Sequence, residues 1–151
     1  MKELEFLQAS EYGRYATEIL NFFIPLALQL PKLRDDSTFM VTTVKAVGAS
    51  GIEDVVTEAD RFMQKRIKEE VGRIHPDWQF WGEEGEDNIT EYNPTKSFIL
   101  ITDPIEGTIN FRSRKDEWWG TVIALVDIKS KEPVIGIVAY PYKDRFYLGI
   151  K

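Results

Sequence analysis

Acidic and small residues cluster in the stretch "ITDPIEGTINF", residues 101–111. Asp103 follows an apolar run that predicts a buried strand, and Glu106 stands three residues later, directly before a glycine and a threonine. Hard cations such as Mg²⁺ prefer carboxylate and carbonyl oxygens as ligands. Glycine lets successive backbone N–H groups turn toward an anion, and a threonine hydroxyl can hold a water. The stretch therefore predicts either a tight turn started by Pro104 or a metal-and-phosphate site.

A second acidic pair follows "WQFWG", residues 78–82, which predicts a strand. Glu83 and Glu84 come directly after it, within the segment "EEGEDN". Strand ends are where rigid scaffolds present functional groups, and two divalent ions ~3.5–4 Å apart can clamp a phosphate and activate a water. Two other interpretations stay open for this segment. It is a solvated acidic loop, or it is a Ca²⁺-binding loop, although it lacks the residue pattern of an EF-hand.

Helices are predicted to precede these strands. Residues 11–30 have apolar side chains at helical spacing, with Ser10 as N-cap and Pro25 as a kink or break. A second short helix is predicted around residues 38–47, followed by a mobile loop over residues 48–51.

The most clearly marked helix begins after Thr57, because Thr57 as N-cap and Asp60 three residues later have the spacing of a capping box. Pro76 ends it. Its apolar stripe consists of Met63, Ile67, Val71 and Ile74. Asp60 is either only the capping partner or also orients the hydroxyl of Thr108. The single histidine, His75, stands at the predicted helix end without a positioned partner, so we assign it no catalytic role.

Three β-rich segments follow the opening stretch, over residues 118–128, 133–142 and 145–150. Short polar turns separate them, which predicts an antiparallel meander. We therefore expect one α+β domain over residues 1–151, with N-terminal helices packed on a mostly antiparallel β-sheet. Trp118 and Trp119 are interpreted as packing side chains rather than as a substrate platform.

The composition limits the classes of partner. The net charge is -6 and no basic cluster is present, which argues against binding nucleic acid through its phosphates. No apolar stretch approaches the ~20 residues that span a bilayer, and the polar N-terminus lacks a signal-peptide core, so no membrane partner is expected. The absence of cysteine excludes disulfides and thiolate metal sites and fits a cytoplasmic protein.

Three segments together resemble the inositol monophosphatase family, the Mg²⁺-dependent, lithium-sensitive phosphomonoesterases related to fructose bisphosphatases. The segment "VVTEADRFMQKRI" is similar to the family's V-T-x-x-D helix start, and "WGEEGED" is similar to its G-E-E segment. The most specific match is "DPIEGTINF", which is similar to the signature D-P-I-D-G-T-x-N-F. The resemblance extends from the first helix to the end of the chain.

The resemblance implies a set of metal ligands. Glu83 would bind metal and so serve catalysis, Asp103 would bridge two ions, and the carbonyl of Ile105 would bind the first ion. Glu106 stands where the family has an aspartate that binds the second ion, which places its carboxylate one methylene farther out. Mg²⁺ is the expected ion, and Mn²⁺ or Ca²⁺ is the alternative because these larger ions accept less regular geometry.

The resemblance also implies residues that act on the phosphate and on the attacking water. The amides of Gly107 and Thr108 would hold the phosphate. Thr108 and Asp60 would orient the water. Glu84 would support the metal ligands, and Lys45 would lie near the metals.

The chain departs from the family in one more respect, since the family's C-terminal α/β half, with a further metal-binding aspartate and most substrate contacts, has no match here. The first hypothesis is metal-dependent hydrolysis of an inositol phosphate or related sugar phosphate, impaired by the missing half and by Glu106. The alternative is a non-catalytic domain that binds metal or phosphate and associates with itself. The expected partners are a small phosphorylated polyol or sugar and a second copy, or another protein, on the exposed sheet face.

Overall fold

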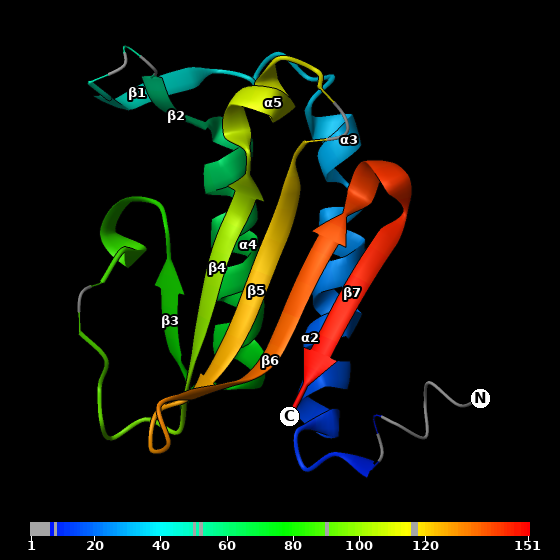
Figure 1. Cartoon of the computed structure of the whole chain (residues 1–151), viewed down its shortest axis with the longest axis vertical. Coiled ribbons are helices and arrows are strands. Elements are labelled where there is room, and N and C mark those ends of the chain that lie inside the picture. The colour runs from blue at the N-terminus through cyan, green and yellow to red at the C-terminus, as the bar shows by residue number, and fades with distance from the viewer. Residues whose placement is uncertain (1–6, 8, 50, 52, 90, 116–117) are drawn as a thin grey trace.

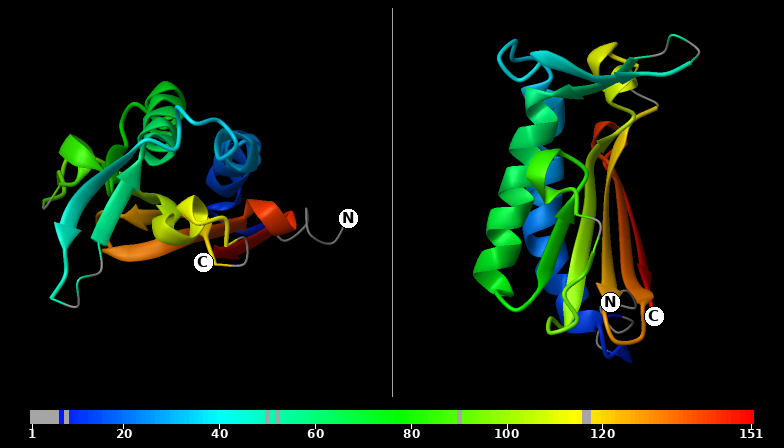
Figure 2. Two further views of the ribbon diagram at one scale, coloured as in Figure 1. Left: turned by 90° about the horizontal axis from the view of Figure 1, so that it is seen from above. Right: turned by 90° about the vertical axis from the view of Figure 1, so that its left-hand side faces the viewer.

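Helices cover one face of a five-stranded sheet, and a separate two-stranded hairpin crosses one end of both layers (Figures 1 and 2). The structure is a computed structural model. It describes residues 7, 9–49, 51, 53–89, 91–115 and 118–151. This arrangement confirms the predicted α+β class.

The first helix is shorter than predicted. Helix α2 spans Gly13–Ala27 and contains Pro25 in its last turn, and the short helix α3 follows as Leu30–Leu33. Tyr12 is the N-cap residue, so the prediction of Ser10 as N-cap is wrong. The Ser10 hydroxyl instead accepts a hydrogen bond from the Tyr12 N–H at 3.2 Å, one step before the helix.

The second long helix, α4, spans Glu58–Ile74 and confirms the predicted capping box. The Thr57 hydroxyl accepts from the Asp60 N–H, and the Asp60 carboxylate accepts from the Thr57 N–H. Met63, Ile67 and Val71 are buried as the apolar stripe predicts. His75 caps the C-terminus of α4.

The segment predicted as a short helix around residues 38–47 forms a strand instead. Strand β1, Thr42–Val47, pairs antiparallel with β2, Glu53–Thr57. The chain between Thr42 and Val47 is rich in β-branched residues, which favour a pleated conformation over a helix. β1 is largely exposed, whereas β2 buries its second half against the neighbouring elements.

The five-stranded sheet has the order β3-β4-β5-β6-β7. Its strands are β3 Gln79–Gly82, β4 Phe98–Glu106, β5 Gly120–Asp127, β6 Glu132–Tyr140 and β7 Arg145–Ile150. The pair β3–β4 is parallel and the other three pairs are antiparallel. The meander predicted for the last three segments is therefore confirmed.

Strand β4 runs through the stretch that the alternative interpretation assigned to a tight turn at Pro104. The strand continues to Glu106, with an irregularity in its pairing with β5 between Asp103 and Glu106. Gly107 then reverses the backbone and the one-turn helix α5, Thr108–Arg112, begins. Two 3-10 turns, η1 at Gly85–Asp87 and η2 at Pro141–Lys143, complete the described elements.

The core lies between the helices and the sheet. It includes Ile19, Phe23, Met63, Ile67, Leu100, Ile123, Leu125 and Ile137, all almost completely buried. Trp119 joins this core, as predicted, but Trp118 is 69% exposed, so its assignment to packing is wrong. Within the described residues, no helix combines the length and apolarity needed to cross a membrane.

Candidate metal and phosphate site

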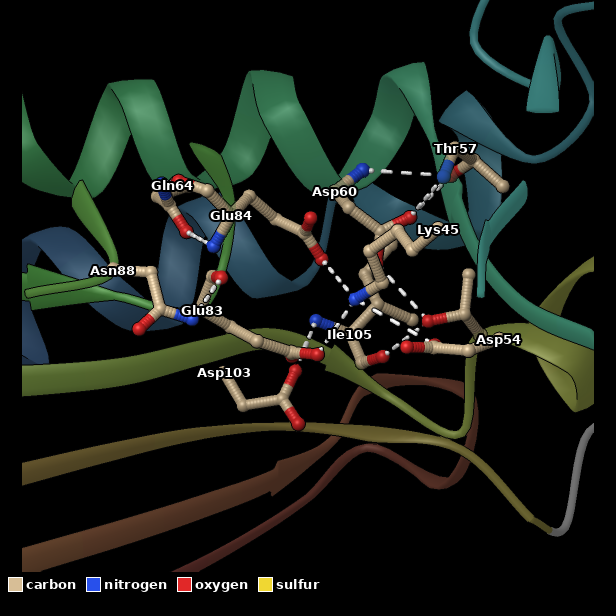
Figure 3. Close-up of polar contacts among 11 residues, drawn as sticks. Lys45, Asp54, Thr57, Asp60, Gln64, Glu83, Glu84, Asn88, Asp103 and Ile105 are labelled. Atoms are coloured by element: carbon tan, nitrogen blue, oxygen red, sulfur yellow. Dashed lines mark hydrogen bonds and ion pairs between the residues drawn. The ribbon is translucent and has the colours of Figure 1, made fainter. Parts of the chain in front are cut away.

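Most of the predicted site residues gather where β3 and β4 end, beneath the β1–β2 hairpin and beside the start of α4 (Figures 1 and 3). A cavity of about 580 Å³ opens here, and we call it the acidic cavity. Its lining includes Glu53, Asp54, Glu83, Asp103, Glu106, Gly107 and Thr108.

Asp60 connects the start of α4 with the start of α5. One of its carboxylate oxygens accepts from the N–H of Thr57 at 2.8 Å and from the Thr57 hydroxyl. The other oxygen lies 3.2 Å from the hydroxyl oxygen of Thr108, which also lies 2.9 Å from the carbonyl oxygen of Ile105. Asp60 is therefore more than the capping partner of Thr57, because it also contacts the hydroxyl of Thr108.

Burial dominates the electrostatics of Asp60, whose side chain is 1% exposed. It raises the pKa of this carboxyl to about 6, against the hydrogen bonds from Thr57 that favour the charged form. The negative charge of Glu84 adds to the increase. A carboxylate with a pKa near 6 can accept a proton close to neutral pH and release it again.

Lys45 points its ammonium at the acidic residues from the hairpin (Figure 3). Its Nζ lies 2.8 Å from Glu83 Oε1, 3.1 Å from Glu84 Oε1 and 3.6 Å from Asp54 Oδ1. The pairing of β1 with β2 shifts register between Val44 and Ala46, so Lys45 occupies a bulge. A bulge redirects a side chain. Burial alone would lower the pKa of Lys45, but its hydrogen bonds to Glu83 and Glu84 outweigh it and raise that pKa.

Gln64 of α4 fixes the backbone of the acidic segment. Its Oε1 accepts from the N–H of Glu84 at 2.8 Å, and its Nε2 donates to the carbonyl of Glu84 at 2.7 Å. Gly82 makes room for this clamp, since a Cβ there would lie 2.2 Å from Cδ of Gln64. The sequence interpretation did not include Gln64 or Gly82. A glutamine on the inward face of a helix is the signal that could have pointed to the clamp.

Three carboxylates meet at the end of β4. Burial of Asp103, the negative charge of Glu83 and a hydrogen bond with Glu106 raise the pKa of Asp103 to about 8. Figure 3 shows the side chains of Glu83 and Asp103 directed toward each other. Asp103 Oδ1 also accepts from the N–H of Ile105 at 3.1 Å. A group of like charges this close is stable only when protons or cations lie among them.

Gly107 has a φ of 84°, a left-handed conformation that favours glycine. A Cβ at this position would lie 2.5 Å from the carbonyl oxygen of Trp118. The Asn110 side chain donates to the same carbonyl at 3.0 Å. Thr108 is the first residue of α5, so its N–H has no acceptor within the helix and is available to an anion.

The structure thus brings together the carboxylates of Glu83, Asp103 and Glu106, the Asp60–Thr108 pair, and Lys45 with Glu84. The Ile105 carbonyl faces the Thr108 hydroxyl. Among the described residues, no three acidic or histidine side chains already have the arrangement that encloses a metal ion. Instead, the ammonium of Lys45 forms ion pairs with Glu83 and Glu84.

His75, to which we assign no catalytic role, lies away from this cluster. Its ring stacks on Trp78 with 3.7 Å between ring centroids, and its Nε2 lies 2.9 Å from Glu18 Oε2. The segment "EEGEDN" is tied to its surroundings by Asn88, whose side chain donates to the carbonyl of Glu83 at 3.0 Å.

Comparison with known proteins gives consistent matches. A sequence profile described as "Inositol monophosphatase family" matches residues 16–151. The chain is 35% identical over 106 residues to a "Fructose-1,6-bisphosphatase/inositol-1-monophosphatase" of Aquifex aeolicus, covering 67% of this chain and 36% of that protein. It is 28% identical over 143 residues to "Inositol monophosphatase 1" of Bos taurus, covering 89% of this chain and 47% of that protein. The chain therefore spans less than half the length of these relatives.

A solved structure matches at the level of the fold and the sequence. The structure titled as an IMPase of Thermotoga maritima superimposes with a TM-score of 0.63 and 29% identity, covering 87% of this chain and 48% of that chain.

Proposed function

We propose that this chain, which belongs to the inositol monophosphatase family, forms part of a divalent-metal-dependent phosphate-monoester hydrolase. The proposed substrate is an inositol phosphate or a related sugar phosphate. The observation that carries the proposal is the position of the Asp60–Thr108 pair beside the carboxylates of Asp103, Glu83 and Glu106. These groups come from α4, α5 and the ends of β3 and β4, so the fold itself assembles them.

The donor set fits a hard divalent cation. Carboxylates of Glu83, Asp103 and Glu106 and the carbonyl of Ile105 would hold it, and all of these are oxygen ligands. Burial, and after it the negative charge of Glu83, raises the pKa of Asp103, so a bound cation would offset the cost of keeping these carboxylates charged. A bound Mg²⁺, or Mn²⁺ in its place, would supply charge neutralisation and lower the pKa of water. Glu106 places its carboxylate one methylene farther out than an aspartate would, and this change of geometry favours a larger ion that accepts less regular coordination.

Thr108 and Asp60 would orient the attacking water. The Thr108 hydroxyl donates toward Asp60 or the Ile105 carbonyl, which leaves its oxygen lone pairs to accept a hydrogen bond from water. Asp60 fixes that hydroxyl and is itself fixed by Thr57. The nucleophile would therefore meet a preorganised acceptor rather than a mobile side chain.

The start of α5 would hold the phosphate. Gly107 lets the backbone turn, and the Thr108 N–H is free of an intrahelical acceptor. Lys45 would then have two roles: balancing the carboxylates without metal, and moving to Asp54 when a cation binds. The distance of 3.6 Å from its Nζ to Asp54 Oδ1 supports this second position.

The test is phosphate release from inositol 1-phosphate by the intact 151-residue chain, with Mg²⁺ and Mn²⁺ titrated separately. We expect release that requires the metal and falls by on the order of 10³-fold in Asp103→Asn, because a metal contributes several kcal/mol to transition-state stabilisation. Asp77→Asn is the matched control, since Asp77 is exposed and, among the described residues, its carboxylate accepts a hydrogen bond from the Ser97 hydroxyl alone. Equal loss in both variants, or metal-independent release, would overturn the proposal.

Replacing Glu106 by aspartate separates a catalytic site from a binding domain. If the site is catalytic and limited by the longer side chain, Glu106→Asp raises the rate with Mg²⁺. If the variant changes only Mg²⁺ affinity, and neither protein releases phosphate while both stay folded, the chain is a metal-binding domain that has no hydrolase activity by itself.

A further inference from the structure

A line of polar side chains runs along helix α4 beside its apolar stripe. Asp60, Gln64 and Lys68 are spaced four residues apart, so they follow one another on the same side of the helix, and we call them the polar stripe. Asp60 is 1% and Gln64 4% exposed, whereas the side chain of Lys68 is 54% exposed. Because a buried polar side chain costs free energy unless it is hydrogen-bonded, the partners of this stripe indicate what it does.

The first two members of the polar stripe hold two different parts of the proposed metal site. Asp60 contacts the hydroxyl of Thr108 at the start of α5. Gln64, one helical turn later, bonds both the N–H and the carbonyl of Glu84 on the chain that leaves β3 (Figure 3). Because both side chains project from one helix, α4 sets the spacing between Thr108 and the acidic residues that follow β3.

Asp87, in the 3-10 turn η1, connects the second and third members of the polar stripe. One of its carboxylate oxygens accepts from Nε2 of Gln64 at 3.1 Å, and the other accepts from the ammonium of Lys68. The side-chain amide of Gln64 is therefore fully used, since its oxygen accepts from the N–H of Glu84 and its nitrogen donates to the carbonyl of Glu84 and to Asp87. A flipped amide would place donor against donor, so these contacts fix one orientation of Gln64.

The backbone of Glu83 is fixed from the other side. Its N–H donates to the carbonyl of Thr102 on β4 at 3.3 Å, and its carbonyl accepts from the side chain of Asn88 at 3.0 Å. With the two bonds from Gln64, each backbone N–H and carbonyl of Glu83 and Glu84 has a partner. The two acidic side chains therefore start from a backbone that is tied to β4 and to α4 at once.

We propose that Gln64 and Asp87 are positioning residues for the metal site, and that Lys68 holds Asp87 in its place. None of the three is among the proposed ligands. They act by fixing the backbone from which the carboxylates of Glu83 and Glu84 project. Hydrogen-bonding partners that orient ligands typically change metal affinity by about 10- to 100-fold. The effect on metal binding rests on the proposed function, whereas the effect on the backbone of Glu84 does not.

The first measurement needs no metal. Amide hydrogen exchange of Glu84 is followed by NMR on the intact chain in EDTA, because this N–H is the one that Gln64 accepts. In Gln64→Met the amide should exchange about 10-fold faster, as expected for the loss of one hydrogen bond. In Asp87→Asn it should exchange faster by a smaller factor, since asparagine offers one oxygen where Asp87 uses two. The amide of Ile67, in the buried stripe of α4, is the internal control and should keep its rate.

The second measurement is calorimetric titration of Mn²⁺ into the same proteins. Gln64→Met should weaken binding by about 10- to 100-fold and Asp87→Asn by about 3- to 10-fold. Lys68→Met should resemble Asp87→Asn, and Lys68→Arg should restore the affinity because it keeps a cationic donor for Asp87.

The matched control for Asp87→Asn is Glu86→Gln. It removes the same charge one residue away, from an exposed side chain that forms no hydrogen bond or ion pair with the described residues. Its Mn²⁺ affinity should change about 2-fold or less, because an exposed charge is screened by solvent. Equal losses in the two variants would show that negative charge rather than hydrogen bonding matters, and this would overturn the proposal.

The remaining outcomes separate this proposal from the proposed function. A parent chain that binds no Mn²⁺ overturns both. Parent-like Mn²⁺ binding in Gln64→Met and Asp87→Asn, or unchanged exchange of the Glu84 amide in both variants, overturns the positioning role alone. Thermal unfolding in EDTA shows whether each variant folds. If Gln64→Met does not fold, Asp87→Asn decides, because the side chain of Asp87 is 20% exposed and lies outside the core.

Discussion

The acidic cavity shares Glu106 with a second hollow, which lies on the sheet face that the described helices leave uncovered. Its lining includes Trp118, Tyr140, Lys143, Arg145 and Tyr147, and we call it the aromatic cavity. The two cavities are built in opposite ways. Around the acidic cavity, Asp60 and Lys45 contact its lining residues and are themselves held by several hydrogen bonds or ion pairs. In the aromatic cavity, Lys143 and Arg145 form no ion pair with the rest of the described chain. The side chains of the first cavity are fixed before a ligand binds, and its carboxylates lie close enough to repel one another. The side chains of the second cavity are exposed and contribute little to the free energy of folding. Substitutions in the acidic cavity should therefore change stability as well as chemistry, whereas those of the exposed side chains in the aromatic cavity should change stability little.

The largest expected effect is on catalysis through Asp60. Asp60→Asn keeps the shape of the cap but removes the acceptor charge beside the Thr108 hydroxyl. We expect the rate of phosphate release to fall by about 10²–10⁴-fold, the usual contribution of a positioned acid or base. The free energy of unfolding should change by about 1 kcal/mol or less, because the amide oxygen of an asparagine at this third helical position can still accept the hydrogen bond from the Thr57 N–H. A rate within 10-fold of the parent chain would contradict this role.

The next largest effect concerns the backbone between the two cavities. Gly107→Ala places a Cβ against the Trp118 carbonyl and forces a φ of 84° on a residue that rarely adopts it. We expect a loss of about 2–4 kcal/mol in the free energy of unfolding, measured by urea denaturation. Gly136→Ala is the control, because a Cβ at Gly136 meets no atom within 4 Å and its φ is not positive. Equal losses in the two variants would show that the contact with Trp118 is unimportant.

A third effect is the dependence of stability on pH in metal-free protein. The pKa of Asp103 rises from 3.8 to about 8 on folding, so its contribution to stability is complete below pH 3.8 and is lost as the pH rises through 8. The pKa of Asp60 is also raised, to about 6, so its contribution to stability is lost by about that pH. The stability lost above pH 6 is therefore assigned to Asp103. We expect the free energy of unfolding to fall by about 1–2 kcal/mol between pH 6 and pH 8, after solvent screening is included.

That loss should disappear in Asp103→Asn, which should be the more stable protein at pH 8 in EDTA. Added Mg²⁺ should also reduce it for the parent chain, because a cation replaces the proton among the carboxylates. An unchanged dependence of stability on pH in Asp103→Asn would show that a group other than Asp103 titrates in this range.

The smallest expected effect is on cation affinity. Lys45→Met removes the ammonium that lies on Glu83 and Glu84, so an entering cation no longer competes with it. Mn²⁺ should bind about 5- to 10-fold more tightly, equivalent to about 1 kcal/mol for one partly exposed charge. Lys129→Met, in the exposed turn after β5, is the control. Weaker Mn²⁺ binding in Lys45→Met would mean that Lys45 positions the carboxylates rather than competing for them.

Much of the site could be predicted because its residues belong to regular local patterns. The Thr57–Asp60 capping box and the acidic residues after predicted strands are visible in the order of residues alone. The side chain of Lys45 points at the acidic residues because it stands at a bulge in the β1–β2 hairpin. The sequence did not predict this, because the segment around residues 38–47 was interpreted as a short helix. The concentration of β-branched residues over Thr42–Val47 was the signal for that strand.

The aromatic cavity was missed for a different reason. Trp118 and Trp119 are adjacent, and neighbouring residues in an extended segment point to opposite faces. Treating the pair as one packing unit therefore hid the exposed ring of Trp118. The remaining members, Tyr140, Lys143 and Tyr147, come together through the register of β6 with β7. The predicted meander pairs these two strands but does not fix that register.

The clamp between Gln64 and the backbone of Glu84 has a consequence for how this sequence can diverge. The glutamine fills the space that a Cβ at Gly82 would take, so the two positions are not free to change independently. A larger residue at position 82 displaces the amide group of Gln64, which then loses its two hydrogen bonds to the Glu84 backbone. In a family of such chains, glycine and glutamine at these positions should be inherited as a pair.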